Sequence, residues 1–183
     1  MNLSDFVRGY TNAASNELIE EMFDWFYNSK SAKTENPNRI TRKDLQKWVP
    51  VGTPLYNKIQ QVKFTMLDKY LQEFPYAYRG NLKLESEETK IQRTDINGGG
   101  FHNFHAEQSH YKNARRVLAW TIYLNDIPDG EGETQFLLEN IKVQPKKGMG
   151  CIFPASWMWQ HRGNPVYTES KYISTGWYLY PKE

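Results

Sequence analysis

The sequence changes character near residue 80, and this change is the strongest constraint on the fold. From there to the end of the chain, short apolar or alternating runs are separated by Gly, Pro, Asn and Asp. Short strands at regular spacing with such turn residues are typical of all-β sandwiches and barrels. The predicted strands lie within residues 82–95, 115–126, 141–145, 148–154 and 171–181.

The first 79 residues instead carry helical periodicity. Residues 15–29 repeat apolar side chains with a 3.6-residue period after Ser15 or Asn16 as a cap, and residues 55–74 do so before Pro75. Residues 39–48 are expected to form a short helix or a loop. The sequence therefore predicts a mainly β member of the α+β class in one domain, residues 1–183, with a helical support layer (1–79) packed on a β core (80–183).

The bulk composition argues against several classes of partner. The net charge of the 183 residues is +2, which is too small to indicate nucleic acid or an anionic membrane. No run approaches the roughly 18 apolar residues that span a bilayer, and the first residues lack a signal-peptide core. Cys151, the one cysteine, lies in the apolar run MGCIF and is expected to be buried. These observations predict a cytoplasmic protein that binds neither nucleic acid nor membrane.

Three of the four histidines lie within nine positions, in the segment GGGFHNFHAEQSH at residues 98–110. On a helix, His102 and His105 would be neighbours, but glycines precede them and the surroundings are strand-like. On a strand, residues of equal parity share a face, so His105 and Glu107 point together and His102 points away. His110 falls in the loop toward the next strand. The spacing selects His105 and Glu107 as two ligands for one metal ion.

A third ligand is needed, and the remaining histidine is His161, 54 residues after Glu107. Two histidines and one carboxylate form the facial triad of non-haem Fe(II) oxygenases, which leaves coordination positions open. The same residues also suit a zinc ion with an open position. A His-x-Glu motif alone does not decide between these, since most occurrences in proteins are coincidental.

The order of the remaining motifs adds a resemblance. FHNFHAE, RRVLAWTIYLND, GEGETQF, IKVQPKKGMGCIFPASWMWQHRGNPV and KYISTGWY follow one another between about residues 90 and 180. This combination resembles the 2-oxoglutarate- and Fe(II)-dependent oxygenases of the prolyl 4-hydroxylase-like group. The resemblance implies a double-stranded β-helix (jelly roll) with the N-terminal helices packed on one sheet. It also maps the iron ligands onto His105, Glu107 and His161, although Asp is commoner than Glu in the family.

The resemblance further implies residues that bind 2-oxoglutarate. Lys171, ten positions after the distal histidine, matches the basic residue that pairs with the far carboxylate of this cosubstrate, where many relatives have Arg. Thr175 has the same parity and is expected to add a hydroxyl contact. Tyr123 matches a position whose phenol often contacts the cosubstrate, or it packs in the core. Gln92 and Thr94 stand where relatives often have a tyrosine, and which of them contacts the cosubstrate stays open.

The expected reaction is hydroxylation of a C–H bond with conversion of 2-oxoglutarate and O2 to succinate and CO2, and ascorbate is the expected reductant. The first predicted substrate is a prolyl residue in a peptide or protein, on the resemblance alone. A free amino acid or another small molecule is the main alternative, and a metal-binding jelly roll without turnover is a further one. A nucleic-acid demethylase is disfavoured because KYISTGW stands where those relatives carry two arginines. The sequence leaves the oligomeric state open.

Overall fold

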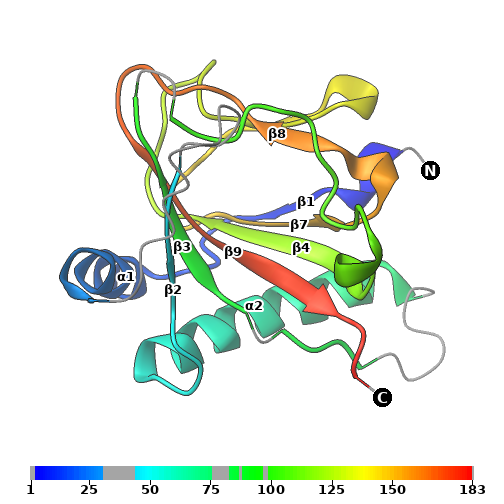
Figure 1. The fold of residues 1–183 in the computed structure, drawn as a ribbon, viewed down its shortest axis with the longest axis horizontal. Helices are drawn as coiled ribbons and strands as arrows, with labels where there is room; N and C mark the ends of the chain where they lie inside the picture. Colours follow the sequence, from blue (N-terminus) through cyan, green and yellow to red (C-terminus); the bar gives the residue numbers. More distant parts are fainter. Residues whose placement is uncertain (1–2, 31–43, 76–82, 87, 97–98, 183) are drawn as a thin grey trace.

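The protein consists of two facing antiparallel sheets with helices on one side of the larger sheet (Figure 1). The computed structural model describes residues 3–30, 44–75, 83–86, 88–96 and 99–182. The larger sheet has six strands in the order β1-β7-β4-β9-β3-β2, and the smaller sheet has the order β6-β5-β8. This arrangement confirms the predicted jelly roll.

The strands are short, as the turn-rich sequence predicts. The larger sheet comprises β1 (Arg8–Tyr10), β7 (Gly150–Pro154), β4 (Arg116–Tyr123), β9 (Lys171–Leu179), β3 (Lys90–Thr94) and β2 (Leu45–Trp48). The smaller sheet comprises β6 (Lys142–Val143), β5 (Thr134–Phe136) and β8 (His161–Gly163). Four 3-10 turns complete the described elements: η1 (Leu3–Phe6), η3 (Tyr111–Asn113), η4 (Leu138–Asn140) and η5 (Trp157–Trp159).

Both predicted helices are confirmed, and their ends have local causes. Helix α1 (Asn16–Asn28) begins after Ser15, whose hydroxyl accepts a hydrogen bond from the Leu18 amide. Helix α2 (Pro54–Glu73) begins after Thr53 in the same way, with a proline at its first position, and ends just before Pro75. No helix in the described part of the chain is long and apolar enough to cross a bilayer.

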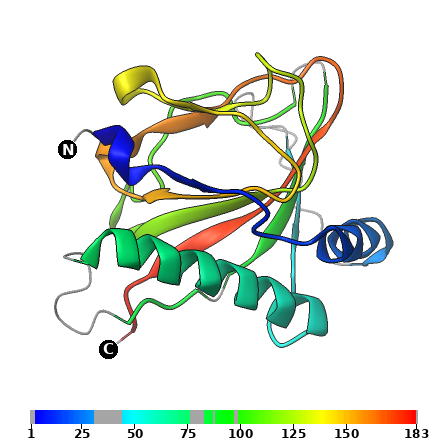
Figure 2. The same ribbon diagram turned by 180° about the vertical axis from the view of Figure 1, so that it is seen from behind.

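Helix α2 covers the outer face of the six-stranded sheet (Figure 2). Ile59 and Met66 of the helix are buried in one cluster with Ile91, Trp120 and Ile152 of the sheet. Full burial of an apolar side chain of this size stabilises a fold by about 1.5–3 kcal/mol. The helical layer therefore fixes the sheet that carries the cavity residues described below.

The two faces of β9 differ in character because side chains alternate along a strand. Lys171, Thr175 and Trp177 face a cavity between the two sheets. Tyr172 and Tyr178 belong to the apolar core beneath the helices. One strand thus presents polar and aromatic groups inward and anchors the sheet to the helices outward.

The prediction of a short helix or loop at residues 39–48 was wrong in its second half, because Leu45–Trp48 form β2. Residues 39–43 lie outside the described residues. Strand β1 also precedes residue 79, so both outer strands of the large sheet come from the segment expected to be helical. The predicted division at residue 80 therefore does not separate helices from strands. Propensity missed β2 because its pairing with β3 is some 45 residues distant in sequence.

Candidate active site

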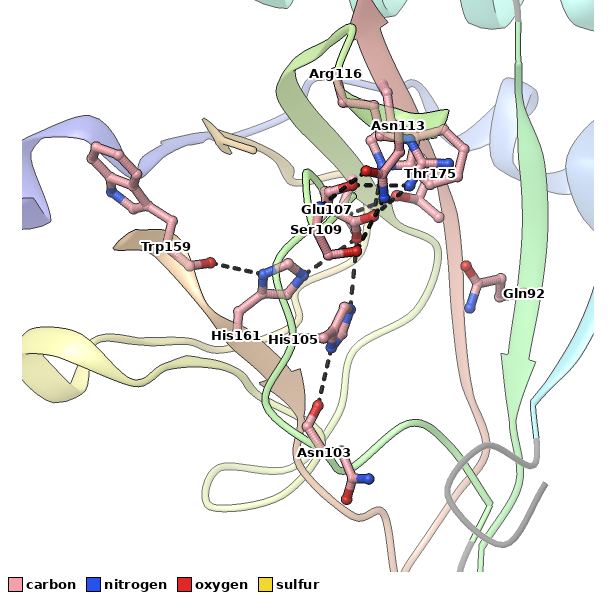
Figure 3. Close-up of polar contacts among 12 residues, drawn as sticks. Gln92, Asn103, His105, Glu107, Ser109, Asn113, Arg116, Trp159, His161 and Thr175 are labelled. Atoms are coloured by element: carbon pink, nitrogen blue, oxygen red, sulfur yellow. Dashed lines mark hydrogen bonds and ion pairs between the residues drawn. The ribbon is translucent and has the colours of Figure 1, made fainter. Parts of the chain in front are cut away.

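His105, Glu107 and His161 converge at one end of the space between the sheets (Figure 3). His105 and His161 form an isolated antiparallel bridge, with reciprocal N–H···O=C bonds of 3.0 and 2.9 Å. The segment around His105 is therefore a single bridge and not the strand that the sequence predicted. One ligand atom from each of the three side chains lies within 4.8 Å of the others.

Hydrogen bonds to the backbone orient both imidazoles. Nδ1 of His105 lies 3.0 Å from the Asn103 carbonyl, and Nδ1 of His161 lies 3.0 Å from the Trp159 carbonyl. Because a carbonyl oxygen only accepts, each Nδ1 carries a hydrogen, and Nε2 is the ring atom left to bind a metal ion. The two Nε2 atoms lie 3.7 and 3.5 Å from Oε1 of Glu107. Three donor atoms thus face one point.

The second oxygen of Glu107 is occupied by two donors. Oε2 accepts from the Trp177 indole at 2.8 Å and from the Arg116 guanidinium at 3.3 Å. Arg116 also donates to the Glu107 carbonyl, and its guanidinium stacks 3.5 Å from the Trp177 ring centroid. Burial alone would raise the pKa of the Glu107 carboxyl, but hydrogen bonds and charge from His105 and His161 hold it well below its usual range. Glu107 is therefore an anion with Oε1 directed at the imidazoles.

The triad lines a cavity of about 420 Å³, and Lys171 lines the same cavity. The Lys171 side chain is buried, with 5% of the residue exposed, and its ammonium donates to the Gly132 carbonyl at 2.7 Å. Burial lowers the pKa of Lys171 to about 8, and the nearby Glu133 carboxylate opposes this shift. A buried cation in the same cavity as a metal-type triad suits a ligand with two ends, one at the metal position and a negatively charged one at Lys171.

The other residues predicted to contact a cosubstrate divide into two groups. Thr175, Gln92 and Thr94 line the cavity. The Thr175 hydroxyl donates to the Trp120 carbonyl at 2.6 Å and lies 3.3 Å from the Thr121 hydroxyl. Gln92 donates to the Asp44 carboxylate at 2.5 Å and lies apart from the triad in Figure 3.

Tyr123 is fully buried and is not among the cavity-lining residues of the described chain. Its hydroxyl bonds with the Thr134 hydroxyl at 2.8 Å, and Thr134 does line the cavity. Burial raises the pKa of the Tyr123 phenol. The structure therefore connects Tyr123 to the cavity through Thr134.

The other two histidines of residues 98–110 form hydrogen bonds with backbone groups. His102 donates from Nδ1 to the Gly163 carbonyl at 2.7 Å, and His110 accepts from the Lys112 amide at the start of η3. Among the glycines, a Cβ at Gly99 would lie 2.4 Å from the Asp95 carbonyl oxygen, and Gly100 has a φ of 112°. Glycine is required at both positions for the turn that leads into the triad.

Trp159 and Arg162, which flank the distal histidine, contribute to packing. Trp159 lies edge-on to Phe6 at 5.8 Å and is not among the described residues that line the cavity. Arg162 donates twice to the Gln135 amide oxygen and lies over the Phe104 ring. Cys151 is buried, as the sequence predicts.

Sequence reasoning missed several cavity residues: Asp44, Gln46, Trp48, Glu88, Lys90, Arg116 and Trp177. Trp177 had a usable signal, because it continues the parity of Lys171 and Thr175 along β9. No sequence pattern placed Trp48 and Gln46 at the cavity, because β2 was not recognised as a strand. Arg116 starts β4 beside a second arginine, and nothing local distinguishes the two.

The sequence model of the 2OG-Fe(II) oxygenase superfamily matches residues 89–179, about half of the chain. This region contains the complete triad and Lys171. The chain belongs to the 2OG-Fe(II) oxygenase superfamily. Membership implies Fe(II), 2-oxoglutarate and O2 as cofactor and cosubstrates. No curated protein shows a significant sequence match.

Solved structures of prolyl hydroxylases share the fold of this oxygenase. The viral collagen prolyl hydroxylase of Paramecium bursaria Chlorella virus-1, in its 2OG complex, has a TM-score of 0.69 at 19% identity over 97% of both chains. A prolyl-4-hydroxylase of Pseudomonas putida has a TM-score of 0.70 at 17% identity over 97% of this chain and 96% of its own. A Trichoplax adhaerens prolyl hydroxylase, in complex with a hypoxia inducible factor peptide fragment, has a TM-score of 0.72 at 16% identity, over 96% and 84%.

The residues of the cavity fit the groups that the superfamily implies. Two neutral imidazoles and one carboxylate are the donor set expected for Fe(II) in an oxygenase. The buried ammonium of Lys171 offers a counter-charge for the carboxylate of 2-oxoglutarate that does not contact a metal. Both features lie in one cavity, and its remaining volume is available to a substrate.

Proposed function

We propose that this protein is an Fe(II)- and 2-oxoglutarate-dependent dioxygenase that hydroxylates a prolyl residue in a peptide or protein. The balanced reaction converts 2-oxoglutarate, O2 and a C–H bond into succinate, CO2 and a C–OH group. The observation that carries the oxygenase part is the triad opening into a cavity that also holds the buried Lys171 ammonium. A purely structural jelly roll has no use for both features.

Each cavity residue has a role in this proposal. His105, Glu107 and His161 hold Fe(II), which when bound supplies the activation of O2 coupled to decarboxylation of 2-oxoglutarate. Lys171 binds the far carboxylate of 2-oxoglutarate. Trp177 and Arg116 occupy Oε2 of Glu107, so the carboxylate presents Oε1 alone to the metal position.

The prolyl substrate is supported by the fold. The three solved relatives named above are prolyl hydroxylases, and they match this chain over nearly its whole length. Aromatic side chains in the cavity wall, Trp48 and Trp177, suit an apolar ring beside the metal. A free amino acid is the competing substrate class, because the chemistry at the triad does not depend on what carries the C–H bond.

The test is a turnover assay with a panel of proline-containing peptides, free proline and other free amino acids. The protein is supplied with Fe(II), 2-oxoglutarate, O2 and ascorbate, and products are read by a mass gain of one oxygen together with succinate. The Glu107→Ala variant is the control. We expect oxygen incorporation in peptides that contain proline and none in matched peptides with alanine instead.

The outcomes separate the two parts of the proposal. Oxygen incorporation into free amino acids alone would reject the prolyl-peptide substrate and retain the oxygenase. Absence of both succinate and oxidised product throughout the panel would reject the oxygenase itself and favour a metal-binding scaffold.

A further inference from the structure

The cavity extends beyond the triad to a second wall, which is built from β2 and β3 at the edge of the large sheet (Figure 1). Lys90 lies in this wall. Strand pairing sets Thr94 opposite Lys171 and Lys90 opposite Thr175. Lys90 therefore lies four residues along the sheet from Lys171, roughly 13 Å at the usual strand rise. One cavity thus contains two buried lysines in separate places.

The Lys90 side chain is held by aromatic rings. Only 6% of the residue is exposed, and its ammonium lies 5.5 Å from the Trp48 ring centroid and 5.0 Å from that of Trp177. Both distances are in the range of cation–π contacts. Since Trp177 also contacts Glu107, the Lys90 ammonium lies one side chain away from the metal triad.

A chain of amides fixes the position of the Lys90 head group. Lys90 donates to the Gln46 amide oxygen at 3.4 Å, and the Gln46 amide nitrogen donates to Asp44 at 2.6 Å. Gln92 donates to the same Asp44 oxygen at 2.5 Å. All four residues line the cavity. Asp44 orients Gln46 so that its oxygen, and not its nitrogen, faces the ammonium.

Arg116 is the other cation at this end of the cavity, and its surroundings differ. It approaches Trp177 from β4, the strand on the opposite side of β9 from β3. Its guanidinium binds Glu107 and lies in the field of the Glu88 carboxylate. Arg116 is therefore engaged in holding a metal ligand.

We propose that Lys90 binds a carboxylate of the substrate, so that the enzyme selects substrates with a negative charge close to the carbon that is hydroxylated. This inference rests on the proposed function and names the substrate chemistry of that site. Charge-assisted hydrogen bonds to a buried ammonium are about twice as strong as neutral ones. The indoles of Trp48 and Trp177 contact the apolar part of the same substrate.

Two sources can supply this carboxylate: the α-carboxylate of a free amino acid, or an acidic group next to proline in a peptide. Matched probes separate them. One pair is L-proline and L-prolinamide, and the other is N-acetyl-Pro-Glu-amide and N-acetyl-Pro-Gln-amide. Each probe is titrated calorimetrically into the protein loaded with 2-oxoglutarate and with Mn(II), which suits the same ligands without turnover.

In at least one pair, the carboxylate member should bind about 10- to 100-fold more tightly than the amide member. The preference should vanish in Lys90→Met, return in part in Lys90→Arg, and persist in Lys112→Met, a matched change at an exposed lysine outside the cavity lining. The pair that shows the preference identifies the source of the carboxylate.

Equal affinities within both pairs, a lack of binding by every probe, or a preference that survives in Lys90→Met would each overturn the inference. Loss of 2-oxoglutarate binding in a folded Lys90→Met protein would overturn it as well, by assigning Lys90 to the cosubstrate. Failure of the unchanged protein to bind 2-oxoglutarate would instead contradict the proposed function, so the two failures are distinguishable.

Discussion

Lys63 and Lys171 are buried on opposite faces of the six-stranded sheet, and their surroundings are different. Lys63 projects from α2 into the outer face, with 0% of the residue exposed. Its ammonium donates to the Ser86 carbonyl at 2.9 Å and the Thr89 hydroxyl at 3.1 Å, and lies over the Trp120 ring. Lys171 projects from β9 into the inner face and lines the cavity beside the triad.

The difference teaches that burial of a cation does not by itself indicate a binding site. Burial lowers the pKa of both lysines, to about 7 for Lys63 and about 8 for Lys171. Lys63 is enclosed by core side chains and supports the segment that leads into β3. Lys171 shares a cavity with three convergent metal-type ligands, and this shared cavity supports the proposed role of Lys171 in binding 2-oxoglutarate.

The largest expected effect lies at the inner face, in the metal triad. His105→Ala, Glu107→Ala or His161→Ala should each lower metal affinity on the order of 100-fold or more, because each removes one of three donors. Titration with Mn(II) measures this loss. His102→Ala and His110→Ala should retain the metal, since these histidines bond to the backbone. Loss of metal in either control would show that the ligand set is wrong.

The next effect compares the two lysines directly. Lys171→Met should weaken 2-oxoglutarate binding about 10- to 100-fold while the metal still binds, because one charge-assisted bond is lost. Lys63→Met should leave the 2-oxoglutarate affinity as it is in the unchanged protein. Calorimetric titration of both metal-loaded variants measures the difference. Equal 2-oxoglutarate affinities in the two variants would contradict the assignment of a binding role to Lys171 and a structural role to Lys63.

The smallest expected effect is on the pH dependence of stability. It should be larger for Lys63, on the outer face, than for Lys171, on the inner face. A lysine whose pKa is about 7 in the folded state and 10.5 in the unfolded state makes the unfolded chain bind more protons between these values. The free energy of unfolding therefore rises as the pH increases from 7 to 9, by about 2 kcal/mol for Lys63. Lys171 contributes a smaller rise of the same sign.

The Lys63→Met variant should lack this rise in the free energy of unfolding between pH 7 and pH 9. Near pH 7 it should be more stable than the unchanged protein. The Ser86 carbonyl stays satisfied in the variant, because Gln60 donates to it at 2.9 Å. Urea unfolding at pH 7 and pH 9 provides the measurement. If the free energy of unfolding changed equally with pH in the unchanged protein and in Lys63→Met, Lys63 would not have the lowered pKa described above.

Local pattern predicted much of this molecule. The 3.6-residue period located both helices, and strand parity selected His105 from a cluster of three histidines and paired it with Glu107. The structure brings these two side chains together with His161, although the segment forms only a single β-bridge, between His105 and His161. Which side chains of a short extended segment point the same way can be predicted from sequence, because side chains alternate along extended backbone.

The second wall of the cavity could not be predicted, for a physical reason. Strand β2 exists because Gln46 and Trp48 pair with Gln92 and Lys90 of β3, and no local period encodes such a pairing. Lys90 becomes a cavity residue only through that pairing and through Trp177 on the next strand. The part of the site that we propose to contact the substrate is therefore the part that depends most on tertiary structure.

The most direct test of the central claim is succinate formation from 2-oxoglutarate by the protein with Fe(II) and O2. The account predicts that the unchanged protein forms succinate, that a substrate accelerates this, and that Glu107→Ala forms none above the protein-free background. No succinate from the unchanged protein, or equal succinate from Glu107→Ala, would contradict the assignment of the cavity as an oxygenase site.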